Sequence, residues 1–244
     1  MTTNETNRLL AVRRFANFNF DLDKNLQGIL KLATEIYETP VAFITLLDEH
    51  EQWFKVNRGF EVKTMPRDTS FCTHVIMDKD VMVIPDALTD KRFANNPLVD
   101  QAPHIRFYAG APLATNDGHN IGTLCVMDTL VKEIPEDKKQ LLGILAQQAT
   151  HLMELELTYK LLSEKMTQVD TQNKVLMDIA FIQSHEFRGP LTSIMGIMNI
   201  IKEDDLQSPG EYLLMMEEAV NKLDEKIHIV VRSTEIAKQA YFSN

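Results

Sequence analysis

The sequence has 244 residues, of which 44% are hydrophobic and 25% charged, enough for a buried core in one large or two modest soluble domains. Its 35 acidic residues outnumber its 25 basic residues and give a net charge of −10. This charge argues against a general nucleic-acid-binding protein, because such proteins present excess positive charge to the phosphates.

The cysteines and the N-terminal residues indicate a location. Cys72 and Cys125 provide neither a disulfide framework nor a metal-ligand spacing, which fits a reducing compartment. The first residues lack the basic and then apolar pattern of a signal peptide. No apolar run approaches the roughly 20 residues that a membrane-spanning helix needs. We therefore expect a cytoplasmic protein with no membrane span and no bound metal.

The first 150 residues predict helices and strands around one core. A mixed basic and apolar segment (8–20) and an apolar stripe that Pro40 closes (26–36) are typical of helices. Pro135 opens another helix as its first-turn proline. Strand-like patterns occupy 41–47, 52–56, 80–84, 106–114 and 121–127, with the turn signal Asn116-Asp117-Gly118 between the last two. Helices flanking a mainly antiparallel sheet make an α+β domain up to about Thr150.

Five segments of this domain resemble a GAF domain, in the order that this family has them. They are Ser-Phe-Cys-Thr-His (70–74), Val-Ile-Pro-Asp-Ala (83–87), Asp-Lys-Arg-Phe-Ala-Asn-Asn-Pro (90–97), Arg-Phe-Tyr-Ala-Gly-Ala-Pro-Leu (106–113) and Ile-Gly-Thr-Leu-Cys-Val-Met-Asp (121–128). The resemblance implies that residues 1–150 form a GAF sensor domain. It also implies a small ligand between one sheet face and a lid formed by residues 58–100.

The resemblance puts the expected ligand pocket near Phe71, Cys72, His74 and Tyr108. The residues do not specify the ligand. Cys72 and His74 alone make a poor metal site, because a metal ion needs more ligands than two. They do not mark a thiol-linked chromophore either, because Ser-Phe-Cys-x-His is common in GAF domains that have none.

Beyond Thr150 the apolar residues recur at alternating steps of three and four. A seam sustained over about four heptads is typical of a coiled coil, whereas a helix lying on its own domain has a broader apolar stripe. If helical throughout, residues 144–188 would form a rod about 68 Å long, which needs a partner. We therefore expect residues 151–177 to be a coiled-coil signalling helix in a parallel homodimer. The seam consists of Leu152, Leu155, Tyr159, Leu162, Met166, Val169, Asn173, Leu176 and Ala180.

A polar segment, Ile-Gln-Ser-His-Glu-Phe-Arg-Gly-Pro-Leu (182–191), follows the seam. His185 and Arg188 are three residues apart and share a helix face, and Glu186 lies beside the histidine. Pro190 has no N–H, so the carbonyl of Glu186 loses its helical partner and the helix can bend. A neutral imidazole is a usable nucleophile near neutral pH, and an adjacent carboxylate can accept the proton it releases.

This segment resembles the phosphoacceptor box of sensor histidine kinases, Ser-His-Glu-x-Arg-x-Pro-Leu, at Ser184, His185, Glu186, Arg188, Pro190 and Leu191. The resemblance implies that His185 is the phosphoacceptor and Glu186 the general base. It also implies roles for Arg188 and for the helix bend at Pro190. Gly189 stands where many relatives carry Thr or Asn to position a water for dephosphorylation, so phosphatase activity is left open.

Two helices follow the box. The first has an apolar face, and Ser208-Pro209-Gly210-Glu211 is a capping box that opens the second. Two such helices per chain, doubled by dimerisation, give a four-helix bundle. We therefore expect residues 178–244 to form a dimerisation and histidine-phosphotransfer domain. Its inward residues are Ile194, Ile197, Met198, Ile201, Leu213, Met216, Val220, Leu223, Ile227 and Val230.

The sequence contains no glycine-rich ATP lid and no Asp-x-Gly-x-Gly stretch after the box. ATP and Mg²⁺ are therefore expected only on a catalytic domain outside this chain. The chain would be either a piece of a longer kinase, which is the interpretation we favour, or a natural protein that another kinase phosphorylates. We predict that the chain is the sensory and phosphoacceptor part of a cytoplasmic two-component sensor histidine kinase. Its expected partners are a second copy of itself, the ATP-binding kinase domain and a response regulator, and no cofactor of its own is predicted.

Two other functions remain open from the sequence. The chain could be a non-catalytic GAF ligand-binding dimer whose bundle only docks partners. It could also be a thiol redox enzyme, for which Cys72 and Cys125 are the only available thiols. The first is the stronger alternative, because it requires only the dimer seam and a ligand.

Overall fold

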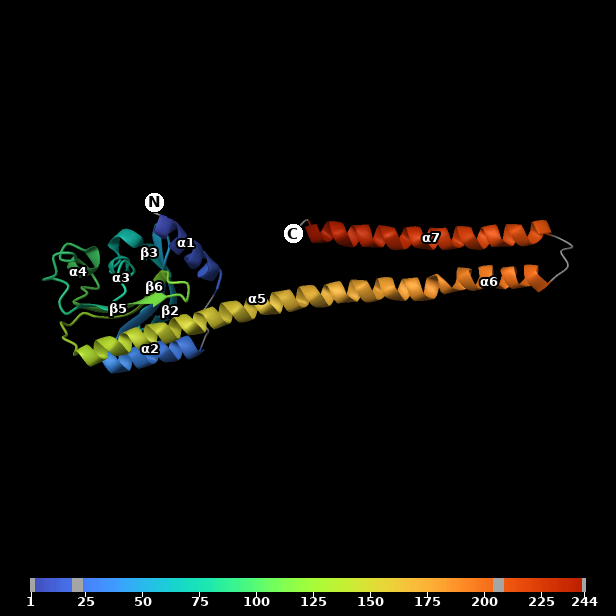
Figure 1. Cartoon of the computed structure of the whole chain (residues 1–244). Helices are drawn as coiled ribbons and strands as arrows, with labels where there is room; N and C mark the ends of the chain where they lie inside the picture. The colour runs from blue at the N-terminus through green and yellow to red at the C-terminus, as the bar shows by residue number, and fades with distance from the viewer. Residues whose placement is uncertain (1–2, 19–23, 204–208, 243–244) are drawn as a thin grey trace. The chain divides into compact units, whose positions relative to one another are not determined.

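A computed structural model describes residues 3–18, 24–203 and 209–242 (Figure 1). The chain divides into two compact units, Met1–Leu161 (the first unit) and Leu162–Asn244 (the second unit). The long helix α5 (Glu136–Glu186) contributes residues to both. Of the residues that the structure describes, no helix is long and apolar enough to cross a membrane.

The first unit is built on a six-stranded antiparallel sheet with the strand order β3-β2-β1-β6-β5-β4. Its strands lie within two residues of the predicted ones, except for β3, which the sequence did not predict. That edge strand has three residues, too few to produce an alternating pattern. The strands are β1 (Val41–Leu47), β2 (Glu51–Arg58), β3 (Thr64–Pro66), β4 (Met82–Ile84), β5 (Phe107–Ala114) and β6 (Asn120–Asp128).

Three helices cover one face of this sheet. Helices α1 (Thr3–Ala16), α2 (Lys24–Tyr37) and the first part of α5 pack against it through side chains such as Phe15, Leu30 and Ala146. The hydroxyl of Tyr37 on α2 donates a hydrogen bond to the carbonyl of Lys138 on α5, which holds these two helices side by side (Figure 1). This core continues along α5 past Thr150 to Met153.

Short elements cover the other face: η1 (Arg67–Thr69), α3 (Cys72–Val75) and α4 (Pro97–Asp100). Successive side chains of a strand point to opposite faces, so Phe43 joins this second core while Ile44 joins the first. The predicted fold of the first unit, an antiparallel sheet flanked by helices, is confirmed.

The second unit contains the end of α5, α6 (Arg188–Glu203) and α7 (Pro209–Phe242). Helices α6 and α7 contact each other, with Ile197 and Ala219 buried between them. Pro209 is the first residue of α7, as predicted, whereas Ser208 of the capping box lies outside the described residues. Many of the predicted seam and bundle residues are exposed in the single chain, among them Leu155, Tyr159, Leu162, Met166, Val169, Leu176, Leu213, Val220 and Ile227.

Seam residue Leu152 differs from the other seam positions. It is half-buried against the core of the first unit, and its neighbour Met153 is fully buried there. The apolar face of α5 therefore packs on its own sheet at this point, and the exposed part of the seam begins with Leu155.

Candidate functional site

Between α5 and α6 the helix is interrupted at Phe187, three residues before Pro190. Proline lacks the N–H that would pair with the carbonyl of Glu186, and its ring crowds that carbonyl. The next pair, from the Leu191 amide to the Phe187 carbonyl, is formed at 3.2 Å, so helical pairing resumes at once. The sequence predicted this weak point from the proline alone.

His185 lies on the last turn of α5 and is exposed to solvent. Its imidazole contacts the ring of Phe181, one turn earlier, with 4.8 Å between ring centroids. The Phe181 side chain is itself 65% exposed, so it supports one side of the imidazole and leaves the ring accessible. Of the other proposed site residues, Arg188 is exposed and Pro190 is half-buried.

The carboxylate of Glu186 forms an ion pair with Lys226 of α7, with 2.6 Å between Oε2 and Nζ. Hydrogen bonding to Glu186 raises the pKa of Lys226, so this lysine stays charged. The contact ties the residue next to His185 to the facing helix. Sequence reasoning missed Lys226, because an exposed lysine on a charged helix carries no local signal.

A cavity of about 420 Å³ lies between α6 and α7, directly after the helix break. Gly189 and Pro190 line it from α6, together with the buried Ile197. The hydroxyls of Thr192 and Ser193 donate to the carbonyls of Arg188 and Gly189, four residues earlier on the same helix, and so satisfy their own hydrogen-bonding needs. The remaining lining residues are Ser193, Met215, Glu218, Ala219 and Lys222.

In the first unit, the residues expected to line a GAF ligand pocket are mostly packed. Phe71, Cys72 and Tyr108 are fully buried, and the Phe71 ring stacks on that of Tyr108 with 5.0 Å between centroids. His74 is exposed and contacts the edge of Phe93. None of the four expected residues lines the two first-unit pockets described below. Their role in ligand binding stays a prediction.

The two cysteines are free and buried on this packed face of the sheet. Tyr108 Oη donates to Cys72 Sγ at 3.3 Å, and Gln52 Nε2 donates to the same sulfur at 3.4 Å. Burial raises the pKa of Tyr108 well above its usual value, so its hydroxyl keeps the proton that it donates. The Tyr108 side chain can occupy this position only because Gly110 has no side chain. A Cβ at Gly110 would lie 2.3 Å from the Tyr108 hydroxyl.

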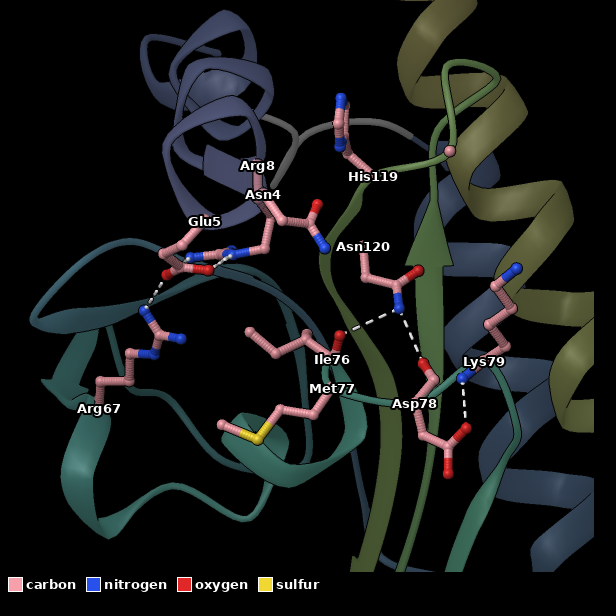
Figure 2. Close-up of a pocket in the computed structure, with 11 residues that line it drawn as sticks. Asn4, Glu5, Arg8, Arg67, Ile76, Met77, Asp78, Lys79, His119 and Asn120 are labelled. Atoms are coloured by element: carbon pink, nitrogen blue, oxygen red, sulfur yellow. Dashed lines mark hydrogen bonds and ion pairs between the residues drawn. The ribbon is translucent and has the colours of Figure 1, made fainter. Parts of the chain in front are cut away.

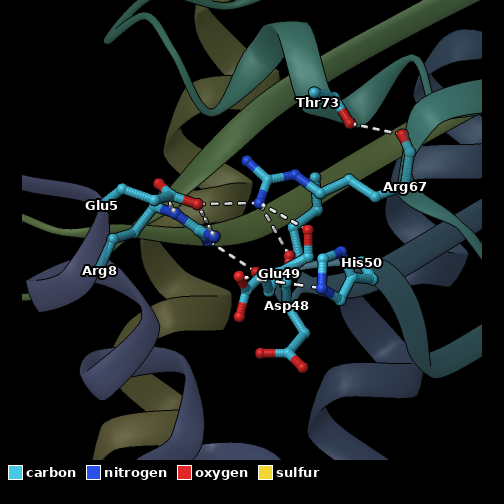
Figure 3. Close-up of polar contacts among 8 residues, drawn as sticks. Glu5, Arg8, Asp48, Glu49, His50, Arg67 and Thr73 are labelled. Carbon is cyan, nitrogen blue, oxygen red and sulfur yellow. Dashed lines mark hydrogen bonds and ion pairs between the residues drawn. The ribbon is translucent and has the colours of Figure 1, made fainter. Parts of the chain in front are cut away.

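A polar pocket of about 350 Å³ lies between α1, η1, the segment after α3 and the β5–β6 hairpin (Figure 2). At one wall, Glu5 bridges two arginines: its carboxylate accepts hydrogen bonds from Arg8 at 2.8 and 2.9 Å and from Arg67 at 2.8 Å (Figure 3). Hydrogen bonds from Arg8 and Arg67 lower the pKa of Glu5 to about 2, against the opposing effect of burial. Sequence reasoning missed this cluster, because its members come from segments far apart in the chain.

A second pocket, of about 320 Å³, is lined almost entirely by apolar side chains. It lies over β1 and β2 on the lid side of the sheet, where the rings of Phe43 and Phe54 meet edge to face with centroids 4.9 Å apart. Its remaining walls come from Phe60, Val62, Met65, Leu98, Pro103, Ile105 and Met127, with Pro40, Val41, Ala102, Asp128 and Thr129 at other points.

The sequence profile of the GAF domain family matches residues 21–151, more than half of the chain. The chain belongs to the GAF domain family. Among the residues that the structure describes, the GAF domain and the helices after it contain no cluster of three or more His, Cys, Asp and Glu side chains that could hold a metal.

Beyond the GAF profile, the chain resembles a cyclic di-GMP phosphodiesterase of Pseudomonas aeruginosa, with 47% identity over 106 residues. The match spans 43% of this chain and 18% of that protein, so the chain covers less than a fifth of its relative's length.

Two solved structures share 16% and 13% identity with the chain. The GAF domain of an Acinetobacter phosphoenolpyruvate-protein phosphotransferase has a TM-score of 0.47, over 66% of this chain and 99% of that one. A domain of a protein named as a two-component sensor histidine kinase, from Sinorhizobium meliloti, has a TM-score of 0.44, over 57% of this chain and 96% of that one. These similarities assign no activity to the chain.

Proposed function

We propose that this chain is the sensory and phosphoacceptor part of a two-component histidine kinase, in which His185 carries the phosphoryl group. The observation that supports this is an exposed imidazole at a helix break, with a carboxylate on the next residue. A phosphoacceptor must be reached by a donor and then by an acceptor protein, and an exposed side chain on the last turn of a helix meets that need.

In the proposed reaction, a nitrogen of neutral His185 attacks the γ-phosphorus of ATP held by a separate kinase domain. The N–P bond forms as the bond to ADP breaks, and Glu186 accepts the proton carried by the other ring nitrogen, which does not attack. The Lys226 ion pair would hold the Glu186 carboxylate in one orientation before the attack. An aspartate of a response regulator would then take the phosphoryl group and return His185 to its neutral form.

Helix α5 supports a route for the signal. Leu142, Ala146 and Met153 of this helix are buried in the GAF core, and His185 lies on its last turn. A change in the GAF domain that turned or shifted α5 would therefore be carried along one continuous helix to the break at Phe187. In the proposed parallel homodimer, the exposed seam of α5 would couple the two copies during that change.

The experiment is phosphorylation in trans. A histidine-kinase ATP-binding domain is incubated with the full chain and ATP labelled at the γ-phosphate, and acid-labile label on the chain is measured. We expect His185→Gln to remove the label, while His228→Gln, at an exposed histidine on α7, keeps it. Equal labelling of His185→Gln and the parent would overturn the assignment. A parent that takes up no label would favour the alternative of a dimer that only docks partners.

A further inference from the structure

The polar pocket between α1 and the β5–β6 hairpin contains hydrogen-bond donors that no protein group uses. Arg67 is the main one: its side chain is only 13% exposed, and its Nη1 donates to Glu5 at 2.8 Å and to the carbonyls of Asp48 at 2.9 Å and Glu49 at 3.4 Å. Within the part of the chain that the structure describes, Nε and Nη2 of Arg67 form no hydrogen bond. Figure 2 shows these two nitrogens turned away from Glu5.

This free edge of the guanidinium has a fixed direction. Three acceptors hold Nη1, so the plane of the group is set before any ligand arrives. Two adjacent N–H groups on one edge of a guanidinium match the two oxygens of a carboxylate. A preorganised pair of donors of this kind loses little conformational entropy on binding.

The opposite wall of the pocket is also polar. Asn120 Nδ2 donates to the carbonyls of Ile76 at 3.0 Å and Asp78 at 2.7 Å, which fixes the segment after α3 against β6 (Figure 2). This leaves Asn120 with only its acceptor Oδ1 free, and Figure 2 shows the Lys79 side chain turned away from Arg67. The unused donors that an anion would meet in this pocket are therefore those of Arg67.

The local charge decides between anion classes. Glu5 stays ionised beside Arg8 and Arg67, so these three side chains together leave one net positive charge. A singly charged carboxylate matches that charge, whereas a phosphate dianion would also face the Glu5 carboxylate. We propose that this pocket binds a small carboxylate, with its two oxygens on Nε and Nη2 of Arg67. This site is separate from the phosphoacceptor proposed at His185.

The test uses the full chain with sodium acetate as the probe, at matched ionic strength and pH 7. Saturation-transfer NMR of the acetate methyl group reports binding, and its dependence on acetate concentration gives the affinity. We expect saturable binding that Arg67→Lys weakens at least about tenfold, because lysine keeps the charge but has no two-donor edge. Lys79→Gln, whose side chain Figure 2 shows turned away from Arg67, should leave binding unchanged, and so should Lys91→Gln, at an exposed lysine that does not line the pocket.

Far-UV circular dichroism checks that each variant is folded, and the saturation of binding to the parent keeps the test valid if Arg67→Lys is not. Binding to the parent that does not saturate would overturn the proposal. So would equal affinity in the parent and Arg67→Lys, or an equal loss of affinity in Lys79→Gln and Arg67→Lys. Inorganic phosphate should compete with acetate only weakly, and strong displacement would assign the pocket to phosphate instead of a carboxylate.

Discussion

The two units of this chain bury their apolar residues to very different degrees. In the first unit, both faces of the sheet are covered, and large side chains such as Phe15, Leu46 and Tyr108 are almost fully buried. In the second unit, only a few described residues such as Ile197, Ala219 and Val230 are buried, while a long series of leucines, methionines and valines is exposed.

This difference indicates which unit can fold alone. Exposed apolar patches of this extent are rare on monomers and mark a surface that another protein covers. The GAF domain satisfies its hydrophobic residues within one chain, whereas the exposed residues of α5, α6 and α7 need a partner. In the proposed homodimer, a second copy of the chain would cover these residues with the same seam on both sides.

The largest expected effect is on dimer formation, through Leu162→Asp. Leu162 is 58% exposed in the single chain and lies on the predicted seam. Two aspartates facing each other in an apolar interface would each cost about 1–3 kcal/mol, so the dimer dissociation constant should rise at least about thirtyfold. Sedimentation equilibrium measures this constant. Leu130→Asp, at an exposed leucine of the first unit off the seam, should remain dimeric, and a parent that is monomeric at micromolar concentration would refute the dimer.

Next in size is the effect of Gly122→Ala inside the GAF sheet. A Cβ at Gly122 would lie 1.8 Å from the carbonyl oxygen of Thr45 on β1, and neither strand can move away within a paired sheet. We expect a loss of at least about 3 kcal/mol in the free energy of unfolding, measured in urea by the fluorescence of Trp53, the single tryptophan.

The matched control for that measurement is Gly143→Ala on α5, whose Cβ would meet Val81 at an ordinary 3.5 Å. Alanine is the better helix former by up to about 1 kcal/mol, so this variant should be as stable as the parent or slightly more so. Similar losses in both variants would contradict the close β1–β6 contact.

A smaller effect is expected from Glu5→Gln, which removes the charge between Arg8 and Arg67. Arg8 is 6% exposed, and it would lose its ionised partner at a cost of about 1–2 kcal/mol in the free energy of unfolding. The folded protein holds the pKa of Glu5 at about 2, below its ordinary value of 4.5. The stabilisation is therefore complete above about pH 4.5 and is lost as the pH falls toward 2.

Urea unfolding of the parent and of Glu5→Gln at several pH values measures this dependence. The difference between the two should narrow as the pH drops below 4.5. Glu35→Gln is the control, because Glu35 forms only an exposed pair with Lys31 at 3.8 Å and its loss should change stability by less than about 0.5 kcal/mol. A difference that grew in acid would have the wrong sign for this ion pair.

The smallest expected effect is at Gly189→Ala, beside the helix break. A Cβ at Gly189 would meet nothing within 4 Å, so alanine should stabilise the first turn of α6 by up to about 1 kcal/mol. Hydrogen exchange of the amides in residues 187–193 should slow accordingly. If bending at this point controls access to His185, phosphorylation in trans should slow as well, while unchanged rates would separate the bend from the chemistry.

Much of the fold follows from local sequence properties. The continuous apolar run of strand length in residues 41–47 and the helical stripe in 26–36 predict β1 and α2, because each pattern reflects the burial of one local element. The short strand β3 was missed, since it exists only through pairing with β2. The sequence also assigned Leu152 to the dimer seam, whereas this residue packs on the core of its own domain. One helix face can contact either its own sheet or a partner chain, and the spacing of the apolar residues is the same in both cases.

The sequence by itself determined the sheet, the long helix and the interruption near His185, because periodicity and a missing proline N–H act over a few residues. Only the tertiary structure brought Lys226 to Glu186, filled the region around Phe71 and Tyr108, and joined Glu5 to Arg67 across 62 positions of sequence. These arrangements depend on contacts between distant segments, where side-chain volume and charge are matched in space and leave no periodic trace along the chain.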